Sequence, residues 1–294
     1  MYGDTFYATH SRFSEPGAYA PLLEDVPHDL AGISRIAQGL VYHYVADQHL
    51  LGYCPPQERL PEVDTRFMER MLARLTELDP RSLSEPRAYE KRLVGCCRDF
   101  ALVACAILRQ RNQPARLRYG FAGYFVPGYW IDHVIVETWD GARWQRFDPE
   151  IPAAREWGFN VLDVPETAFV TGGRAWQLAR DGETDPAVFG LGPAVPDVGG
   201  WWFLRGRLQL DIAALMKQEM LCWDEWGFVN PAGGVSTADE LLLDQAAALS
   251  LQPDSGALRT FIAAEPRLRV PETVTCVSPA AGPHPITVAT AGLS

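Results

Sequence analysis

Apolar positions recur with helical spacing in two segments before residue 80. In residues 30–45 they follow a period close to that of an α-helix, which predicts one amphipathic helix across that range. A second run of apolar positions, in residues 67–78, predicts another helix. This helix should end at Asp79, because the following Pro80 disfavours helical geometry in the residue before it.

A third apolar segment, FALVACAIL from Phe100 to Leu108, has no polar face. A helix formed by such a run must be covered on every side by other elements. We therefore expect it to be the central helix of the fold and to end before Pro114.

The segments that follow predict three consecutive strands, in residues 115–125, 130–139 and 142–147. Between the last two stands Asp140-Gly141, which favours a two-residue hairpin loop. In that register Trp139 pairs with Ala142, and His133 lies directly opposite Asp148 on the same face of the sheet. The pairing depends on the loop, because a bulge or a longer loop changes the register.

Beyond Pro152 the pattern is less regular. We expect a short helix from Asp211, and a second from Thr237, where Thr237 and Glu240 have the spacing of a capping box. The stretch from residue 277 to 294 carries Pro, Gly and Ala without a helical period and predicts a poorly packed tail. The expected organisation is a core with N-terminal helices in residues 1–152, a C-terminal extension packed on it in 153–276, and a flexible tail in 277–294.

Composition and charge narrow the classes of function. The 294 residues are 47% hydrophobic, enough for a sizeable core, and the net charge of −11 argues against a sequence-independent nucleic-acid surface. The N-terminal sequence shows no secretion signal, and no run of apolar residues is long enough to span a membrane, so we expect a cytoplasmic protein without a membrane partner. The sequence leaves the oligomeric state open.

Cysteine usage fits a reducing compartment. The six cysteines lack the density of a disulfide scaffold, and the absence of C-x-x-C and H-x-x-x-H patterns gives no sign of a structural zinc site. They are Cys54, Cys96, Cys97, Cys105, Cys222 and Cys276.

The adjacent pair Cys96-Cys97 opens the central helix. A thiol at a helix start meets the positive end of the helix dipole, which favours the thiolate. With a histidine held by an aspartate, as His133 and Asp148 are expected to be, the three residue types supply a nucleophile, a base and a group that orients the base. The simpler interpretations are a buried structural cysteine, a redox pair, and an ordinary buried His-Asp pair.

The segment from Gly95 to Pro149 resembles the bacterial transglutaminase-like superfamily. It carries that family's pattern in four places, which are Gly95-Cys96-Cys97-Arg98-Asp99-Phe100-Ala101, Gln113-Pro114-Ala115-Arg116, His133 with Glu137, and Trp144 with Asp148-Pro149. It departs from the pattern at Asn112-Gln113, where a glycine-containing turn is usual, and at Val134-Ile135 after the histidine. The segments YGFAGYFVPG, GRAWQLARDGETDPAVFG and LQLDIAALMKQEMLCWDEWG are similar to stand-alone bacterial proteins of this type.

The resemblance implies an α+β fold of papain-like, transglutaminase-like type, with a central buried helix against an antiparallel sheet. It assigns the nucleophile to Cys97, the base to His133 and the orienting carboxylate to Asp148, while Cys96 falls at a variable position. It implies a cysteine-dependent acyltransferase or amide hydrolase that needs no metal or organic cofactor. Its partners would be a small-molecule or peptide acyl substrate and, for transfer, an amine acceptor.

Two other functions remain open at this stage. One is a cysteine peptidase or amidase with the same triad, and the other is a catalytically inert binding protein on the same fold. The identities of the acyl donor and acceptor, and the choice between transfer and hydrolysis, are not encoded in these motifs.

Other side chains receive weaker interpretations. The backbone N–H of Cys97 is the first candidate donor to an oxyanion, with Gln57 or Tyr53 as side-chain candidates. Asp132 should point away from His133 and be structural. Five histidines are expected to be surface or packing residues: His10, His28, His43, His49 and His284. Four tryptophans are expected to pack in the core, although they could line a pocket for the acyl group: Trp201, Trp202, Trp223 and Trp226.

Overall fold

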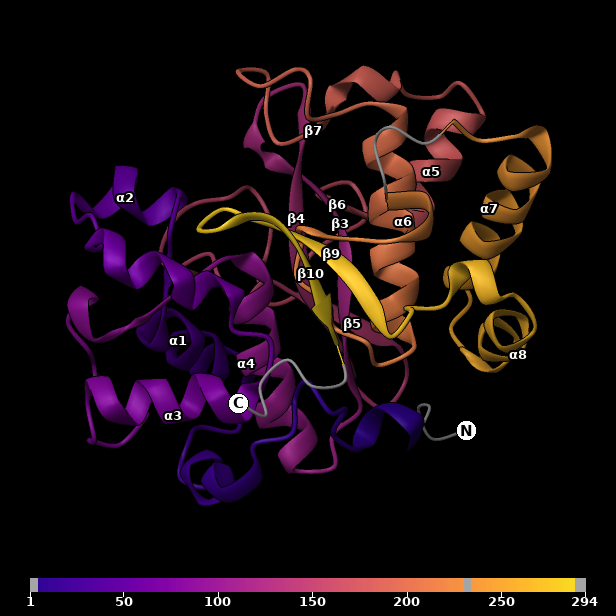
Figure 1. The fold of residues 1–294 in the computed structure, drawn as a ribbon. Helices are drawn as coiled ribbons and strands as arrows, with labels where there is room; N and C mark the ends of the chain where they lie inside the picture. Colours follow the sequence, from indigo (N-terminus) through magenta and orange to yellow (C-terminus); the bar gives the residue numbers. More distant parts are fainter. Residues whose placement is uncertain (1–4, 230–233, 289–294) are drawn as a thin grey trace.

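A curved five-stranded sheet lies between two groups of helices. The computed structural model describes residues 5–229 and 234–288. In Figure 1, α1 to α4 lie on one side of the sheet and α5 to α8 on the other. The helices are α1 (Leu30–Leu40), α2 (Ala46–Leu51), α3 (Met68–Leu78), α4 (Cys97–Gln110), α5 (Gly172–Arg180), α6 (Trp201–Leu215), α7 (Thr237–Ser250) and α8 (Gly256–Ala264).

The strands form three sheets. The main one has the order β5-β4-β3-β6, and β7 pairs with the start of β4. A short parallel pair joins β1 to β2, and β8, β9 and β10 form a third sheet. The strands are β1 (Val41–His43), β2 (Leu93–Gly95), β3 (Ala115–Val126), β4 (Tyr129–Trp139), β5 (Trp144–Phe147), β6 (Phe169–Thr171), β7 (Phe189–Gly190), β8 (Asp224–Glu225), β9 (Thr273–Ser278) and β10 (Gly282–Thr287).

The apolar helix α4 is the centre of the larger core, as its sequence predicted. Its residues from Cys97 to Arg109 are buried. It packs against β3 and β4 on one side and against α1 and α3 on the other. On the opposite face of the sheet, α6 packs on β3 and anchors a second core with α5 and α7. The α+β architecture expected from the resemblance is confirmed.

Two predicted helices have different bounds in the structure. The first ends at Leu40, because Val41–His43 leaves the helix and pairs with Leu93–Gly95. The helix expected from Asp211 starts at Trp201 instead and ends at Leu215. This helix is buried on almost every side. Its N-terminal half therefore lacks the alternation of polar and apolar faces by which a helix is predicted from sequence.

Two details near the C-terminus also differ from the expectations. The cap of α7 is formed by Ser236 and Asp239, not by Thr237 and Glu240. The expected tail is wrong for residues 277–288, since β9 and β10 pair along their length and Val288 is buried. The last six residues, 289–294, lie outside the described part of the chain. The segment expected to form a C-terminal extension supplies two strands to the main sheet, in residues 169–171 and 189–190.

Among the described residues, no helix has both the length and the apolar character that crossing a bilayer requires.

A buried ion network links the sheet to α6. Glu137 accepts from Arg116 at 2.8 Å, from Arg118 at 2.9 Å and from Arg146 at 3.0 Å. Arg118 also forms two hydrogen bonds with Asp211 of α6, at 2.9 and 2.8 Å. The glutamate that follows the histidine by four residues therefore holds β3, β4 and β5 together.

Replacing Glu137 should destabilise the fold strongly. Glu137→Ala leaves two buried guanidinium groups short of a carboxylate, and we expect a loss of about 3–5 kcal/mol in the free energy of unfolding. Urea denaturation at pH 7 measures it. The control is Glu166→Ala, which removes an exposed partner of Arg146 and should change the unfolding free energy by less than about 1 kcal/mol. Equal effects of the two variants would contradict this account.

The same network predicts a dependence of stability on pH. Burial by itself would raise the pKa of Glu137, but its arginine partners outweigh burial and hold it well below the ordinary value. The stabilisation that Glu137 contributes is therefore complete above the ordinary pKa of about 4.5, and it is lost progressively as the pH falls from there through the lower folded-state value.

Candidate active site

The first turn of α4 is built by the residues of the G-x-C-x-D motif. The Asp99 carboxylate accepts a hydrogen bond from the backbone N–H of Cys96 at 2.9 Å, and Arg98 donates to its other oxygen at 2.9 Å. A Cβ at position 95 would lie 2.6 Å from the Asp99 carboxylate, so glycine is required there. The motif thus fixes where Cys97 starts the helix.

His133 and Asp148 meet, as the sequence predicted. His133 Nε2 lies 2.8 Å from Asp148 Oδ2, and both side chains are buried. Because a carboxylate only accepts, Nε2 carries the proton and Nδ1 is the free nitrogen of the neutral ring. Burial by itself would lower the pKa of His133, but Asp148 outweighs it and raises the pKa to about 9. His133 also holds the pKa of Asp148 below its ordinary value, against the opposite effect of burial.

The register that led to this pair is wrong by two residues. Trp139 pairs with Trp144 and Val136 with Phe147, so the loop has four residues instead of two. The Asp140 side chain accepts from the N–H groups of Ala142 and Arg143, which closes the longer turn. A shift by two residues keeps every side chain on its original face, and His133 still reaches Asp148 as a diagonal neighbour.

Glu150 lies beside His133 in the turn that follows β5. Its backbone N–H donates to Asp148 Oδ1 at 2.9 Å, and its Oε2 lies 4.0 Å from His133 Nδ1. That oxygen is buried and has no hydrogen-bond partner among the described residues. Burial raises the pKa of Glu150 to about 8, so its carboxyl group is largely protonated at neutral pH. Glu150 is not among the site residues predicted from the sequence.

Cys97 lies in a cluster with two other cysteines. The sulfurs of Cys96, Cys97 and Cys222 lie within 4.8 Å of one another, and Cys97 keeps 8% of its surface exposed. Donation to Cys222, donation to Cys96 and burial raise the pKa of Cys97 above that of an ordinary thiol. The lowered pKa expected from the helix start is therefore not found. In this cluster Cys222 has the lowered pKa, because Cys96 and Cys97 donate to it and Arg207 lies nearby.

Asp132 has a structural partner, as expected. Its carboxylate binds Arg207 of α6 at 2.5 and 2.8 Å, and Arg207 also donates to the backbone oxygen of Cys222 at 3.0 Å. Burial raises the pKa of Asp132 to about 6 despite this partner. The pair therefore positions the segment that carries Cys222.

His43 is a site neighbour that the sequence did not reveal. β1 pairs with β2 so that His43 lies opposite Gly95, two residues before Cys97. A ring nitrogen of His43, the Cys97 sulfur and a Glu150 carboxylate oxygen lie within 4.8 Å of one another. The expectation that His43 is a surface or packing residue missed this position, because only the strand pairing brings it there.

Two more residues hold the Asp148 loop. Tyr124 donates its hydroxyl hydrogen to Asp148 Oδ2 at 2.5 Å, and burial raises the pKa of Tyr124. Gln38 of α1 donates to the backbone oxygens of Pro149 and Ile151 at 3.1 and 3.2 Å. Gln38 lies in no motif, and Tyr124 lies in the segment YGFAGYFVPG, whose resemblance assigned it no role.

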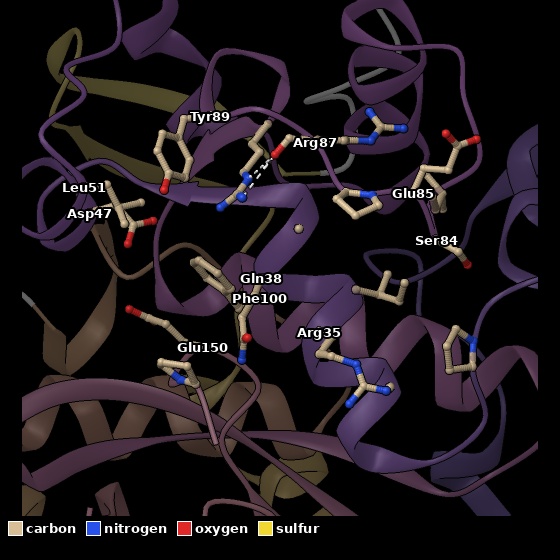
Figure 2. Close-up of a pocket in the computed structure, with 18 residues that line it drawn as sticks. Arg35, Gln38, Asp47, Leu51, Ser84, Glu85, Arg87, Tyr89, Phe100 and Glu150 are labelled. Atoms are coloured by element: carbon tan, nitrogen blue, oxygen red, sulfur yellow. Dashed lines mark hydrogen bonds between the residues drawn. The ribbon is translucent and has the colours of Figure 1, made fainter. Parts of the chain in front are cut away.

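An open pocket of about 560 Å³ reaches this cluster through Glu150. Phe100, one turn after Cys97, also lines it. Figure 2 shows Asp47 and Glu150 at the same end of the pocket, with Arg35 and Ser84 farther away. A substrate in this pocket would therefore contact Glu150 as it approaches the Cys97 thiol.

Among the other sequence candidates, Trp223 directly follows Cys222 and packs its ring against Tyr44. Gln57 is exposed at the start of a 3-10 helix, and Tyr53 packs its ring against Tyr42 and Tyr89. None of the four named tryptophans is among the residues that line the described pocket. Trp223 donates to Asp64, and Trp201 packs against Trp176.

Within residues 5–229 and 234–288, two sets of side chains have the spacing to hold a metal ion. Cys96, Cys97 and Cys222 form a thiol set that would suit a soft metal. The second set is His43, Cys97 and Glu150. Cys222 is far from Cys96 and Cys97 in the sequence, and for this reason the sequence shows no spacing typical of a metal site.

A cysteine at the start of a buried helix, facing strands that carry a histidine and an aspartate, is the arrangement of papain-like cysteine enzymes. Residues 48–149, about a third of the chain, match the family model of the transglutaminase-like superfamily. We call this segment, which is similar to that superfamily, the transglutaminase-like core, and the match supports a cysteine enzyme as the class of protein. The catalytic roles of Cys97, His133 and Asp148 remain predictions.

The other comparisons add little to this assignment. No curated protein matches the chain. Among solved structures, the chain is similar to a protein from Cytophaga hutchinsonii described as a "putative cysteine protease", with 16% identity and a TM-score of 0.33. The match covers 56% of this chain and 44% of that one. At this TM-score, the chemistry of one protein cannot be transferred to the other.

Proposed function

We propose that the protein is an acyl-transfer enzyme that works through a covalent thioester on Cys97. The observation that carries the proposal is the orientation of His133, whose Nε2 is held by Asp148 while Nδ1 lies 4.0 Å from Oε2 of Glu150. A carboxylate oxygen of Glu150 in turn lies within 4.8 Å of the Cys97 sulfur. A histidine fixed in this way leaves one basic nitrogen for a nucleophile.

In the proposed reaction, His133 Nδ1 takes the proton of the Cys97 thiol as the sulfur attacks the carbonyl carbon of an amide or thioester. The tetrahedral oxyanion collapses, the bond to the amine or thiol breaks, and the leaving group takes the proton from His133 Nδ1. The acyl group is then bound to Cys97 as a thioester. An amine or water, deprotonated by His133, attacks this thioester and releases the acyl group and the free thiol.

The choice between transfer and hydrolysis is tested by the mass of the product. N-acetylated peptide amides are incubated with the protein in the presence and absence of methylamine. A transferase gives the N-methyl amide, whereas a peptidase or amidase gives the acid in both incubations. An inert binding protein gives neither product and no acyl adduct on Cys97, and that result would overturn the proposal.

The pH dependence of the reaction has a definite direction. Because Asp148 raises the pKa of His133 to about 9 and the pKa of Cys97 is also raised, the resting pair at pH 7 is imidazolium and thiol. The reactive pair is a neutral His133 beside the Cys97 thiol, which holds one proton fewer than the resting pair. The value of kcat/KM should therefore rise with pH and level off near pH 9. Alkylation of Cys97 by iodoacetamide should follow the same rise. A rate that falls between pH 6 and 9 would contradict this assignment.

A further inference from the structure

The proposed reaction develops negative charge on the substrate oxygen, which requires hydrogen-bond donors beside Cys97. The backbone N–H of Cys97 is one candidate, since it stands at the helix start and donates to no acceptor in the part of the chain that the structure describes. A side chain near the sulfur can supply a second donor. Among the histidine and carboxylate side chains of the described residues, His43 and Glu150 have polar atoms within 4.8 Å of the Cys97 sulfur and of each other.

The backbone around His43 fixes which ring nitrogen carries its proton. The N–H groups of Val45 and Ala46 both donate to His43 Nδ1, at 3.2 and 3.1 Å. Nδ1 is therefore an acceptor, and the proton of the neutral ring is on Nε2. Asp47 holds this turn, because its carboxylate accepts from the backbone N–H of His43 at 2.8 Å.

The ring also stays neutral. Burial, together with the nearby positive His133, lowers the pKa of His43 to about 4. At neutral pH His43 is thus a donor through Nε2 with no proton on Nδ1, and it cannot compete with His133 as a base.

We propose that His43 Nε2–H is the side-chain donor that, with the backbone N–H of Cys97, stabilises the oxyanion formed on a substrate at Cys97. The geometry that supports this is the strand pairing that places His43 beside Gly95, the double hydrogen bond to Nδ1, and the closeness of the ring to the Cys97 sulfur. The assignment rests on the proposed function, because it concerns the same reaction.

The tautomer also argues against a metal ion at His43, Cys97 and Glu150. A metal bound through Nε2 would require the proton on Nδ1, where it would face the two N–H donors of Val45 and Ala46. Nδ1 itself is already occupied by these donors. The same set of atoms is therefore better suited to hydrogen bonding than to metal binding.

The experiment compares two reactions of the same thiol. Acylation of Cys97 by p-nitrophenyl acetate passes through an oxyanion and is followed as a burst of p-nitrophenolate, whereas alkylation by iodoacetamide forms no oxyanion. We expect His43→Ala to slow the burst by about 10²-fold or more and to leave the alkylation rate nearly unchanged. His43→Gln keeps an N–H donor and should recover part of the burst rate. His49→Ala, an exposed histidine on α2, is the matched control and should behave as the wild type.

The outcomes separate the two proposals. A wild-type protein without a Cys97-dependent burst would overturn the acyl-transfer function and the role of His43 with it. A normal burst in His43→Ala would overturn only the role of His43. Equal losses of acylation and alkylation in His43→Ala and His43→Gln would show a structural role instead. A loss of the burst in Glu150→Ala but not in His43→Ala would assign the donor to Glu150.

Discussion

Cys97→Ala should remove product formation from peptide amides, with a loss on the order of 10⁶-fold in kcat, and should abolish the acyl adduct seen by mass spectrometry. The physical reason is that the proposed thioester forms on the Cys97 sulfur, and alanine has no atom that could take its place. The measurement is single-turnover product formation, with intact-protein mass recorded in the same samples.

The matched control is Cys96→Ala. Cys96 is the N-cap of α4, and the hydrogen bond that closes the first turn uses its backbone N–H, which alanine keeps. We expect this variant to retain activity and to form the acyl adduct on Cys97. Loss of activity in Cys96→Ala with full activity in Cys97→Ala would assign the nucleophile to the other member of the pair.

Asp148→Asn should lower kcat by about 10³–10⁴-fold without unfolding the protein. The asparagine amide can donate to His133 Nε2, which would move the ring proton to Nδ1 and block the nitrogen that must accept from Cys97. The pKa of His133 should also fall below its value of about 9, since it loses its carboxylate partner. The rising limb of the pH profile would then shift toward acid.

Two variants control for this result. Tyr124→Phe removes one donor to Asp148 but leaves the contact with His133, and we expect a much smaller loss of kcat. Asp163→Asn changes an exposed carboxylate that pairs with Arg143 and should leave kcat unchanged. A wild-type kcat and pH profile in Asp148→Asn would show that Asp148 does not orient the base.

The contact between His133 and Asp148 could be predicted because strands alternate sides with a period of two residues. The sequence placed the loop at Asp140-Gly141, and the real turn extends to Arg143. An error of two residues preserves the face of each side chain, whereas an error of one would have separated the pair. The prediction of the contact therefore survived a wrong register.

His43 and Cys222 could not be predicted in the same way. Each reaches Cys97 through tertiary contacts, His43 by the pairing of β1 with β2 and Cys222 by the segment after α6 that Arg207 holds. No spacing rule in a single sequence encodes such contacts. The direction of the Cys97 pKa was missed for the same reason, because it depends on donation to Cys222.

The structure also shows that the transglutaminase-like core is not self-sufficient. The matched residues 48–149 omit β1, which completes the pair with β2 and carries His43, and they omit Gln38, which holds the loop after Asp148. They also omit Asp211, so Arg118 would lose a buried carboxylate partner. A fragment cut to these residues would keep Cys97, His133 and Asp148 and still lack the scaffold that aligns them. For engineering, the smallest useful unit of this protein must therefore include α1 and α6 as well as the motif-bearing segment.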